Sequence, residues 1–180
     1  MKLRCYLIAI LAGLSFLTIQ AQETFVFEEW VSTSGTQDMY FYGKSITDGS
    51  GNVYQVGATI NSDGDYDAII SKTDRNGQEL WLETFNPSST GDDTFIDVIL
   101  NSSGEVIATG ASRNASETSS DAFTVQLDVT DGSTDWDETY SYSGSIFNLG
   151  SALAVDGSDN VYVTGLSYNT TDLSDVLILK

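Results

Sequence analysis

Closely spaced acidic residues are the side chains of this sequence whose types and spacing most directly suggest chemistry. Asp63, Asp65 and Asp67 alternate with Gly64 and Tyr66 in one short segment. Carboxylates that alternate in a glycine-containing loop can supply the oxygen ligands of a hard cation such as Ca²⁺. The segment is therefore a candidate calcium loop, and the alternative is a solvated acidic turn that binds no ion.

Two further acidic clusters place carboxylates next to one another, namely Asp92-Asp93 and the group of Asp135, Asp137 and Glu138. Paired carboxylates can act as general acid and general base in a glycosidase or a lyase. In a chain with 26 acidic residues, neighbouring pairs also arise from composition alone. We therefore predict no catalytic residue, and a carbohydrate-active enzyme remains the alternative to a binding protein.

Residue types that are missing from the sequence exclude several kinds of site. The sequence contains no histidine, and its single cysteine is Cys5, close to the N-terminus. Ser-His-Asp and Cys-His catalysis, histidine-ligated zinc, CxxC redox chemistry and disulfide bonds are therefore excluded. We expect no cofactor apart from the calcium ion considered above.

The first 21 residues have the pattern of an export signal. Lys2 and Arg4 form a short basic region, an apolar stretch follows at 5–19, and Ala21 offers a small residue for cleavage before Gln22. No later apolar run approaches the roughly 20 residues that span a bilayer. We predict a secreted or cell-surface protein whose mature part, residues 22–180, does not insert into a membrane.

The charge of the chain limits its partners. Seven basic residues stand against 26 acidic ones, and loss of Lys2 and Arg4 with the signal would leave 5 against 26, a net charge of −21. Such a surface repels phosphate groups, so we expect neither nucleic-acid binding nor docking on anionic lipid. The hydrophobic content of 41% is enough for a folded core.

A repeat of about 54 residues organises the mature sequence. The segments Asp48-Gly-Ser-Gly-Asn-Val-Tyr-Gln-Val-Gly57, Asn101-Ser-Ser-Gly-Glu-Val-Ile-Ala-Thr-Gly110 and Asp156-Gly-Ser-Asp-Asn-Val-Tyr-Val-Thr-Gly165 align without gaps. Further anchors recur at the same period: Asp67, Asp121 and Asp175, which we interpret as turn caps, and Trp81 and Trp136. The loops at 114–120 and 169–174, which correspond to the candidate calcium loop, lack its acidic cluster.

Each repeat predicts four short β-strands separated by turn residues. In the first complete unit the expected strands are 43–47, 53–59, 68–73 and 80–85. Asn76-Gly77 and Asp131-Gly132 are preferred pairs for a two-residue type I′ hairpin between the third and fourth strands. Helical periodicity is absent after Ala21. Four antiparallel strands per repeated unit describe the blade of a β-propeller.

The repeated motifs resemble a known family. The D-x-S-G-N-V-Y-V-x-G turn, the D-A-F/I third strand, the N/D-G hairpin and the fourth-strand tryptophan are similar to the seven-bladed β-propeller (SBBP-type) repeat of secreted bacterial proteins. The resemblance covers about residues 30–180. It implies an all-β fold, a partial β-propeller of four-stranded antiparallel blades in about three repeat units. Because members of this family are mostly uncharacterised extracellular proteins, it implies no particular activity.

The repeat also predicts how the units are divided and packed. We expect a lone fourth strand at about 24–31 within the segment 24–42, units at 43–94 and 95–147, and an incomplete unit at 148–180. Trp30, Trp81 and Trp136 are expected to fill the seams between units, each against the second strand of a neighbour, rather than to serve as platforms for sugar rings.

Three units are fewer than the four to eight blades of closed propellers. We therefore expect the chain to be a fragment of a longer exported propeller, with self-association as the alternative, for example two chains sharing one ring. The functional prediction is a non-catalytic scaffold that binds an extracellular protein or glycan.

Overall fold

The computed structural model describes residues 39–40, 42–87, 90–114, 118–142, 144–169 and 175–180. These residues form β-strands and connecting loops, and this part of the chain contains no helix. It follows that none of its segments is a helix long and apolar enough to cross a membrane. The predicted export signal, the lone strand expected near 24–31 and Trp30 lie outside the described residues.

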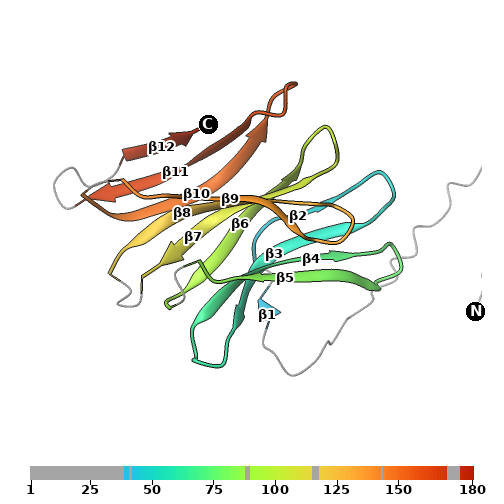
Figure 1. The fold of residues 1–180 in the computed structure, drawn as a ribbon, viewed down its shortest axis with the longest axis horizontal. Coiled ribbons are helices and arrows are strands. Elements are labelled where there is room, and N and C mark those ends of the chain that lie inside the picture. The colour runs from blue at the N-terminus through green and yellow to red at the C-terminus, as the bar shows by residue number, and fades with distance from the viewer. Residues whose placement is uncertain (1–38, 41, 88–89, 115–117, 143, 170–174) are drawn as a thin grey trace, which may run out of the picture. The chain divides into compact units, whose positions relative to one another are not determined.

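The strands form three antiparallel meanders that follow one another along the chain (Figure 1). The first meander consists of β2 (Ser45–Thr47), β3 (Val53–Ile60), β4 (Tyr66–Thr73) and β5 (Glu79–Phe85), and the short β1 (Met39–Tyr40) pairs with the far end of β3. The second meander consists of β6 (Asp93–Leu100), β7 (Val106–Arg113), β8 (Ser120–Leu127) and β9 (Thr134–Tyr140). The third meander consists of β10 (Ser145–Val155), β11 (Val161–Asn169) and β12 (Asp175–Leu179).

The predicted all-β class with antiparallel sheets is confirmed. Each strand expected in the first complete unit is present, with bounds that differ by no more than two residues. The second and third meanders begin at Asp93 and Ser145, a few residues before the unit bounds expected at 95 and 148. One parallel bridge, between Phe147 and Ser120, joins the second and third meanders.

Side-chain oxygens of Asp or Asn fix the conformation of five loops. In each loop the oxygen of the first residue accepts the backbone N–H groups of the residues two and four positions later, and the residue three positions later has a positive φ. Such side-chain turns favour Asp and Asn at the start and Gly where φ is positive. The first residues of these loops are Asp48, Asn61, Asp74, Asn101 and Asp156.

This loop chemistry shows that the predicted type I′ hairpin at Asn76-Gly77 is wrong. A type I′ turn needs a positive φ at both residues, whereas only Gly77 has one, at 84°. The Asp74 carboxylate accepts the N–H groups of Asn76 and Gln78 at 2.8 and 2.9 Å, which holds a longer turn. The prediction at Asp131-Gly132 is wrong in the same way, because Gly132 alone of the two has a positive φ.

Aromatic side chains fill the seam between the first and second meanders. Phe95 stacks on Phe123 at 5.6 Å between ring centroids, and Phe85 meets Phe95 edge-on at 5.4 Å. Trp81 is buried, and its indole N–H donates to the carbonyl of Val129 at 3.2 Å. The seam position predicted for Trp81 is therefore correct, although this hydrogen bond reaches the β8–β9 loop rather than the second strand of the neighbour.

Polar contacts tie the first strands of the three meanders together. The buried Asp97 carboxylate on β6 forms an ion pair with Lys44, which precedes β2, at 2.9 Å. The other oxygen of Asp97 accepts the backbone N–H of Leu153 on β10 at 2.7 Å. A carboxylate that binds both neighbours in this way fixes how the first strands of the three meanders approach one another.

The third meander leaves one apolar face uncovered. Val176 and Ile178 on β12 are 76% and 69% exposed, whereas Ala68 and Ile70, at the same positions of the first meander, are completely buried. In the first meander this face packs on the second meander, within one hydrophobic core. A sheet of the same repeat is therefore the cover that fits the exposed face of the third meander.

We expect a second copy of the chain to cover this face, because exposed apolar patches of this kind promote association. Sedimentation velocity should show reversible association as the protein concentration rises. Ile178→Lys should weaken this association, whereas Tyr142→Lys, at an exposed position outside the face, should not. A wild-type chain that remains monomeric at every concentration would contradict this expectation.

Candidate functional site

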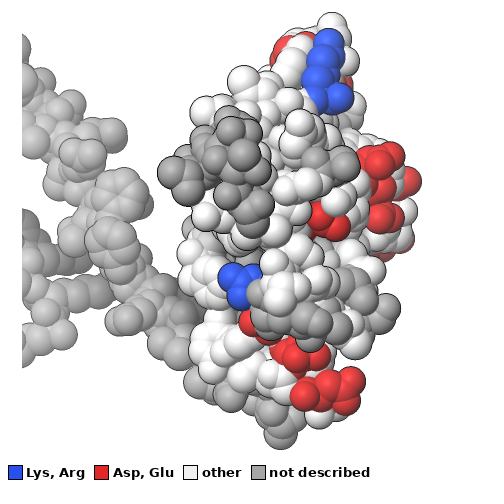
Figure 2. Space-filling model, turned by 90° about the vertical axis from the view of Figure 1, so that its left-hand side faces the viewer, with Lys and Arg blue, Asp and Glu red and all other residues white. Residues whose placement is uncertain are grey.

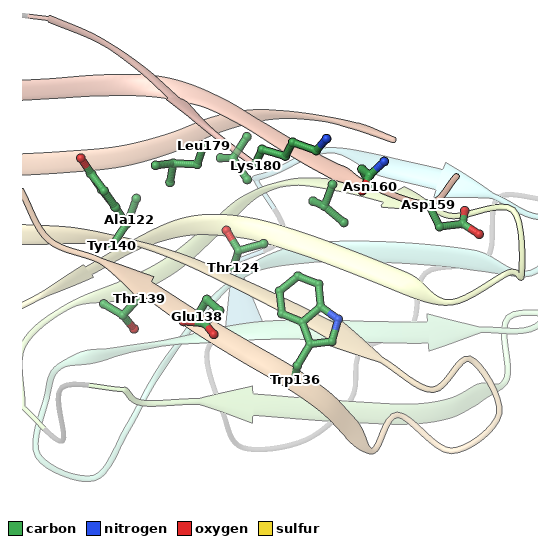
Figure 3. A pocket seen from close by; sticks show the side chains of 12 residues that line it. Ala122, Thr124, Trp136, Glu138, Thr139, Tyr140, Asp159, Asn160, Leu179 and Lys180 are labelled. Carbon is green, nitrogen blue, oxygen red and sulfur yellow. The ribbon is translucent and has the colours of Figure 1, made fainter. Parts of the chain in front are cut away.

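The cavities in the described part of the chain include two that lie between the meanders. The larger, which we call the seam cleft, has a volume of about 570 Å³ and lies between the second and third meanders. Figure 3 shows Trp136, Glu138 and Thr139 on one side of the cleft and Lys180, Leu179 and Asn160 on the other. An aromatic ring, a carboxylate and an ammonium group in one cleft are suitable for ligand binding.

The repeat nevertheless gives the seam cleft a structural explanation. Its Trp136 corresponds to Trp81, and the Lys180 ammonium lies 5.4 Å from the Tyr162 ring as the Lys72 ammonium lies 5.4 Å from the Tyr54 ring. In the first seam, the Val129 carbonyl accepts hydrogen bonds from both Lys72 and Trp81. The seam cleft therefore contains the counterpart of Trp81, although Gln126 pairs with Trp136 where Lys72 pairs with Trp81, and Lys180 comes from the third meander. Because the tryptophan at this position binds a hairpin of the next meander in the first seam, the cleft is not our leading ligand site.

The second cavity, which we call the inner pocket, has a volume of about 440 Å³. It lies near the first strands of the meanders, because β6, β10 and β1, which pairs with β3 as β2 does, all contribute to its wall. Tyrosines and acidic residues alternate with apolar side chains around it. The residues that line it are Tyr40, Tyr42, Tyr66, Asp92, Asp93, Thr94, Ile96, Ala111, Arg113, Phe147 and Leu149.

Asp93 is the unusual residue of the inner pocket. Its side chain is completely buried, and neither carboxyl oxygen accepts a hydrogen bond of normal geometry from the described part of the chain. Burial raises the pKa of Asp93 to about 7, and the nearby charges of Asp67 and Asp92 raise it further, while Ser112 and Arg113 partly oppose the shift. The Arg113 backbone N–H itself donates to the carbonyl of Asp92. A buried carboxyl group without a partner is costly unless a proton or a ligand satisfies it.

The third meander has a residue at the position equivalent to Asp93, which allows the two sites to be compared within one molecule. Asn148 occupies the corresponding position, because Asp93 pairs with Ser112 and Asn148 pairs with the equivalent Ser167. The Asn148 amide is also buried, but it donates to the carbonyl of Ser120 at 3.2 Å and accepts from Ser167 at 2.8 Å. The fold thus accepts a satisfied asparagine where the inner pocket has an unsatisfied acid.

A second residue near Asp93 also differs from its counterpart near Asn148, because a tyrosine stands where the other site has a serine. Tyr66 is the first residue of β4, and Ser120 is the first residue of β8, so the two occupy equivalent positions. Ser120 forms a hydrogen bond with Asn148, and its counterpart near Asp93 is therefore the aromatic Tyr66. The Tyr66 backbone N–H donates to Asp92 at 3.0 Å, and its ring meets that of Tyr40 edge-on at 5.9 Å and 64°. The hydroxyl of Tyr42 forms a hydrogen bond with that of Thr94. These contacts position two aromatic walls near the acid.

The candidate calcium loop has a different organisation from the one its sequence suggested. The Asn61 side chain accepts the backbone N–H groups of Asp63 and Asp65 and donates to the Asp67 carboxylate at 2.8 Å. In the described part of the chain, no three acidic side chains gather closely enough to hold a metal ion. These contacts account for the loop without an ion, and calcium binding stays a prediction that only a binding measurement tests.

The remaining acidic cluster is dispersed over β9. Asp135 is exposed and accepts a hydrogen bond from Gln126 at 3.2 Å, Asp137 is also exposed, and Glu138 lines the seam cleft. The sequence prediction therefore named Asp92 and Asp93 but missed Tyr40, Tyr42 and Arg113. One sequence feature could have indicated this site: when the repeats are aligned, Asp93 stands at the position that Asn148 occupies in the next repeat.

Comparison with known proteins adds no identification. The chain matches no protein-family model, and a search of curated proteins found no similar sequence. We therefore infer a function from the geometry of the site.

The raised pKa of Asp93 predicts how stability depends on pH. Between about pH 4 and pH 7 the folded chain holds a proton on Asp93 that the unfolded chain has lost, so the free energy of unfolding falls as pH rises through this range. Asp93→Asn should remove this decline. At pH 8 the variant should exceed the wild type by on the order of 1–3 kcal/mol, as measured by urea unfolding at pH 5 and pH 8.

Asp135→Asn provides the control for this measurement, because it removes the same formal charge at an exposed position. It should leave the slope of stability against pH unchanged. If Asp93→Asn retains the slope of the wild type, the carboxyl of Asp93 titrates normally and the buried acid is not as described.

Proposed function

We propose that the chain belongs to an exported β-propeller of the SBBP-type family and that its meanders are successive blades. Three features support this proposal. The meanders are antiparallel, they recur at the period of the sequence repeat, and each packs on the first strand of the next. The polar contacts of Asp97 with both neighbouring first strands also fit an arrangement in which these strands face a common axis.

The function that we propose is a non-catalytic binding scaffold, secreted or held at the cell surface, for an extracellular protein or glycan. The observation that carries this proposal is the inner pocket, because propellers bind ligands where their innermost strands converge around the central channel. The acidic surface argues against nucleic acid as the partner, since phosphate groups would be repelled.

A carbohydrate-active enzyme is the alternative, and one observation favours it. Asp93 would hold its proton near neutral pH, as the general acid of a glycosidase must. A glycosidase also needs a second carboxylate placed across the scissile bond, as nucleophile or base. Asp92 is adjacent in sequence and already accepts the Tyr66 N–H through one oxygen, so the geometry supports binding better than catalysis.

A polysaccharide panel separates the two functions. We expect the purified chain to release no reducing sugar and no unsaturated product from any member of the panel, because a scaffold needs no paired acid and base. Turnover that Asp93→Asn abolishes, and that Asp135→Asn retains, would establish the enzyme and overturn the scaffold. The exposed Asp135 is the matched control for the loss of one carboxylate.

A further inference from the structure

The inner pocket is lined by a buried acid whose oxygens accept no hydrogen bond of normal geometry from the described part of the chain. Neither Asp93 oxygen accepts a hydrogen bond of normal geometry from the described residues, although the Ser112 hydroxyl lies near enough to oppose the rise in the pKa of Asp93. The side chain is completely buried in the wall of a cavity of about 440 Å³. Because Asn148 fulfils the structural role at the corresponding position, packing alone does not require an acid at residue 93. The incompletely satisfied carboxyl group points to a ligand.

We propose that the inner pocket binds a small organic ammonium ion, a free primary amine or the side chain of a lysine, whose N–H groups donate to the Asp93 carboxyl. This inference deepens the proposed binding function and rests on it. The tyrosines of the pocket would enclose the cation and the carbon atoms next to it.

The charges around the pocket favour a cation. The acidic groups that face Asp93 are Asp92, at the start of the second meander, and Asp67 on β4, whose charges both act on it. Among the described residues that line the pocket, Arg113 on β7 is the one cationic side chain. On the face of the molecule shown in Figure 2, acidic side chains cover far more area than basic ones. A net charge of −19 attracts cations further.

The walls of the pocket favour an organic cation rather than a metal ion. Tyr40 and Tyr66 present rings at 64° to one another, and Tyr42 also lines the pocket. Aromatic faces attract ammonium groups and suit the recognition of amines. Phe147 and Leu149 provide apolar surface for a hydrocarbon chain. A metal ion would instead need several oxygen ligands, and no group of three acidic side chains of this kind occurs in the described part of the chain.

Ammonium binding should depend on the protonation of Asp93. The carboxyl must lose its proton to accept the ammonium N–H groups with full charge. Since the pKa of Asp93 is about 7, most of the carboxyl groups are protonated at pH 5 and most are ionised at pH 8. The change in affinity between these two pH values therefore reports on the Asp93 carboxyl group.

The test is isothermal titration of the full chain with n-butylammonium chloride at pH 8 and pH 5. We expect saturable binding at pH 8 that is roughly tenfold or more weaker at pH 5. Asp93→Asn should abolish the binding while its thermal melt stays cooperative, as the asparagine at position 148 leads us to expect. Asp135→Asn should bind as the wild type does.

Further probes distinguish the sources of the ammonium group and the competing ligands. Tighter binding of Nα-acetyl-lysine methylamide than of n-butylammonium would assign the site to a lysine side chain, and the reverse order to a free amine. n-Butanol should not bind. Equal loss of binding in Asp93→Asn and Asp135→Asn would overturn the proposal, because it would reflect general attraction by the acidic surface.

Absence of n-butylammonium binding to the wild type, or binding of neutral monosaccharides that Asp93→Asn abolishes, would also overturn the ammonium as the ligand. Neither result would overturn the scaffold, which the polysaccharide panel tests separately through turnover.

Discussion

An antiparallel meander cannot bury both of its faces by itself, and the structure depends on how neighbouring meanders cover one another. The first seam shows the complete arrangement, in which Phe85, Phe95 and Phe123 interlock and Trp81 donates to the Val129 carbonyl. Burial of aromatic side chains on this scale is the main stabilising contribution available to such a fold. Each meander needs the next one to cover its apolar face. The face of the third meander that carries Val176 and Ile178 has no such cover among the described residues and is exposed.

The same dependence locates the inner pocket. The first strands of the meanders approach one another because Asp97 binds Lys44 on one side and the Leu153 N–H on the other. Near this contact the second and third meanders differ in sequence, because the second has Asp93 at the position where the third has Asn148. The Asn148 amide is fully hydrogen-bonded, whereas the Asp93 carboxyl is buried in the wall of a cavity without a hydrogen bond of normal geometry. A functional site on a repeated fold is expected at such a departure from the repeat.

Much of the fold could be predicted from the sequence, because the repeat aligns strands and turns at fixed spacing. The strands of the first complete unit and the burial of Trp81 followed from this alignment. The hairpin type did not, because the Asp74 side chain captures two backbone N–H groups and lengthens the turn. The inner pocket was not predicted either, since Tyr40, Asp93 and Phe147 come from three meanders whose approach the repeat does not specify.

The central claim is that each meander is stabilised by the next meander along the chain. Urea unfolding of variants at two equivalent tryptophans tests this claim most directly. Trp81 is covered by the next meander, whereas Trp136 is only half-buried at the open seam cleft. Trp81→Ala should therefore lower the free energy of unfolding by about 3–5 kcal/mol. Trp136→Ala should lower it by about 1 kcal/mol. Equal losses for the two variants, or a larger loss for Trp136→Ala, would contradict the account.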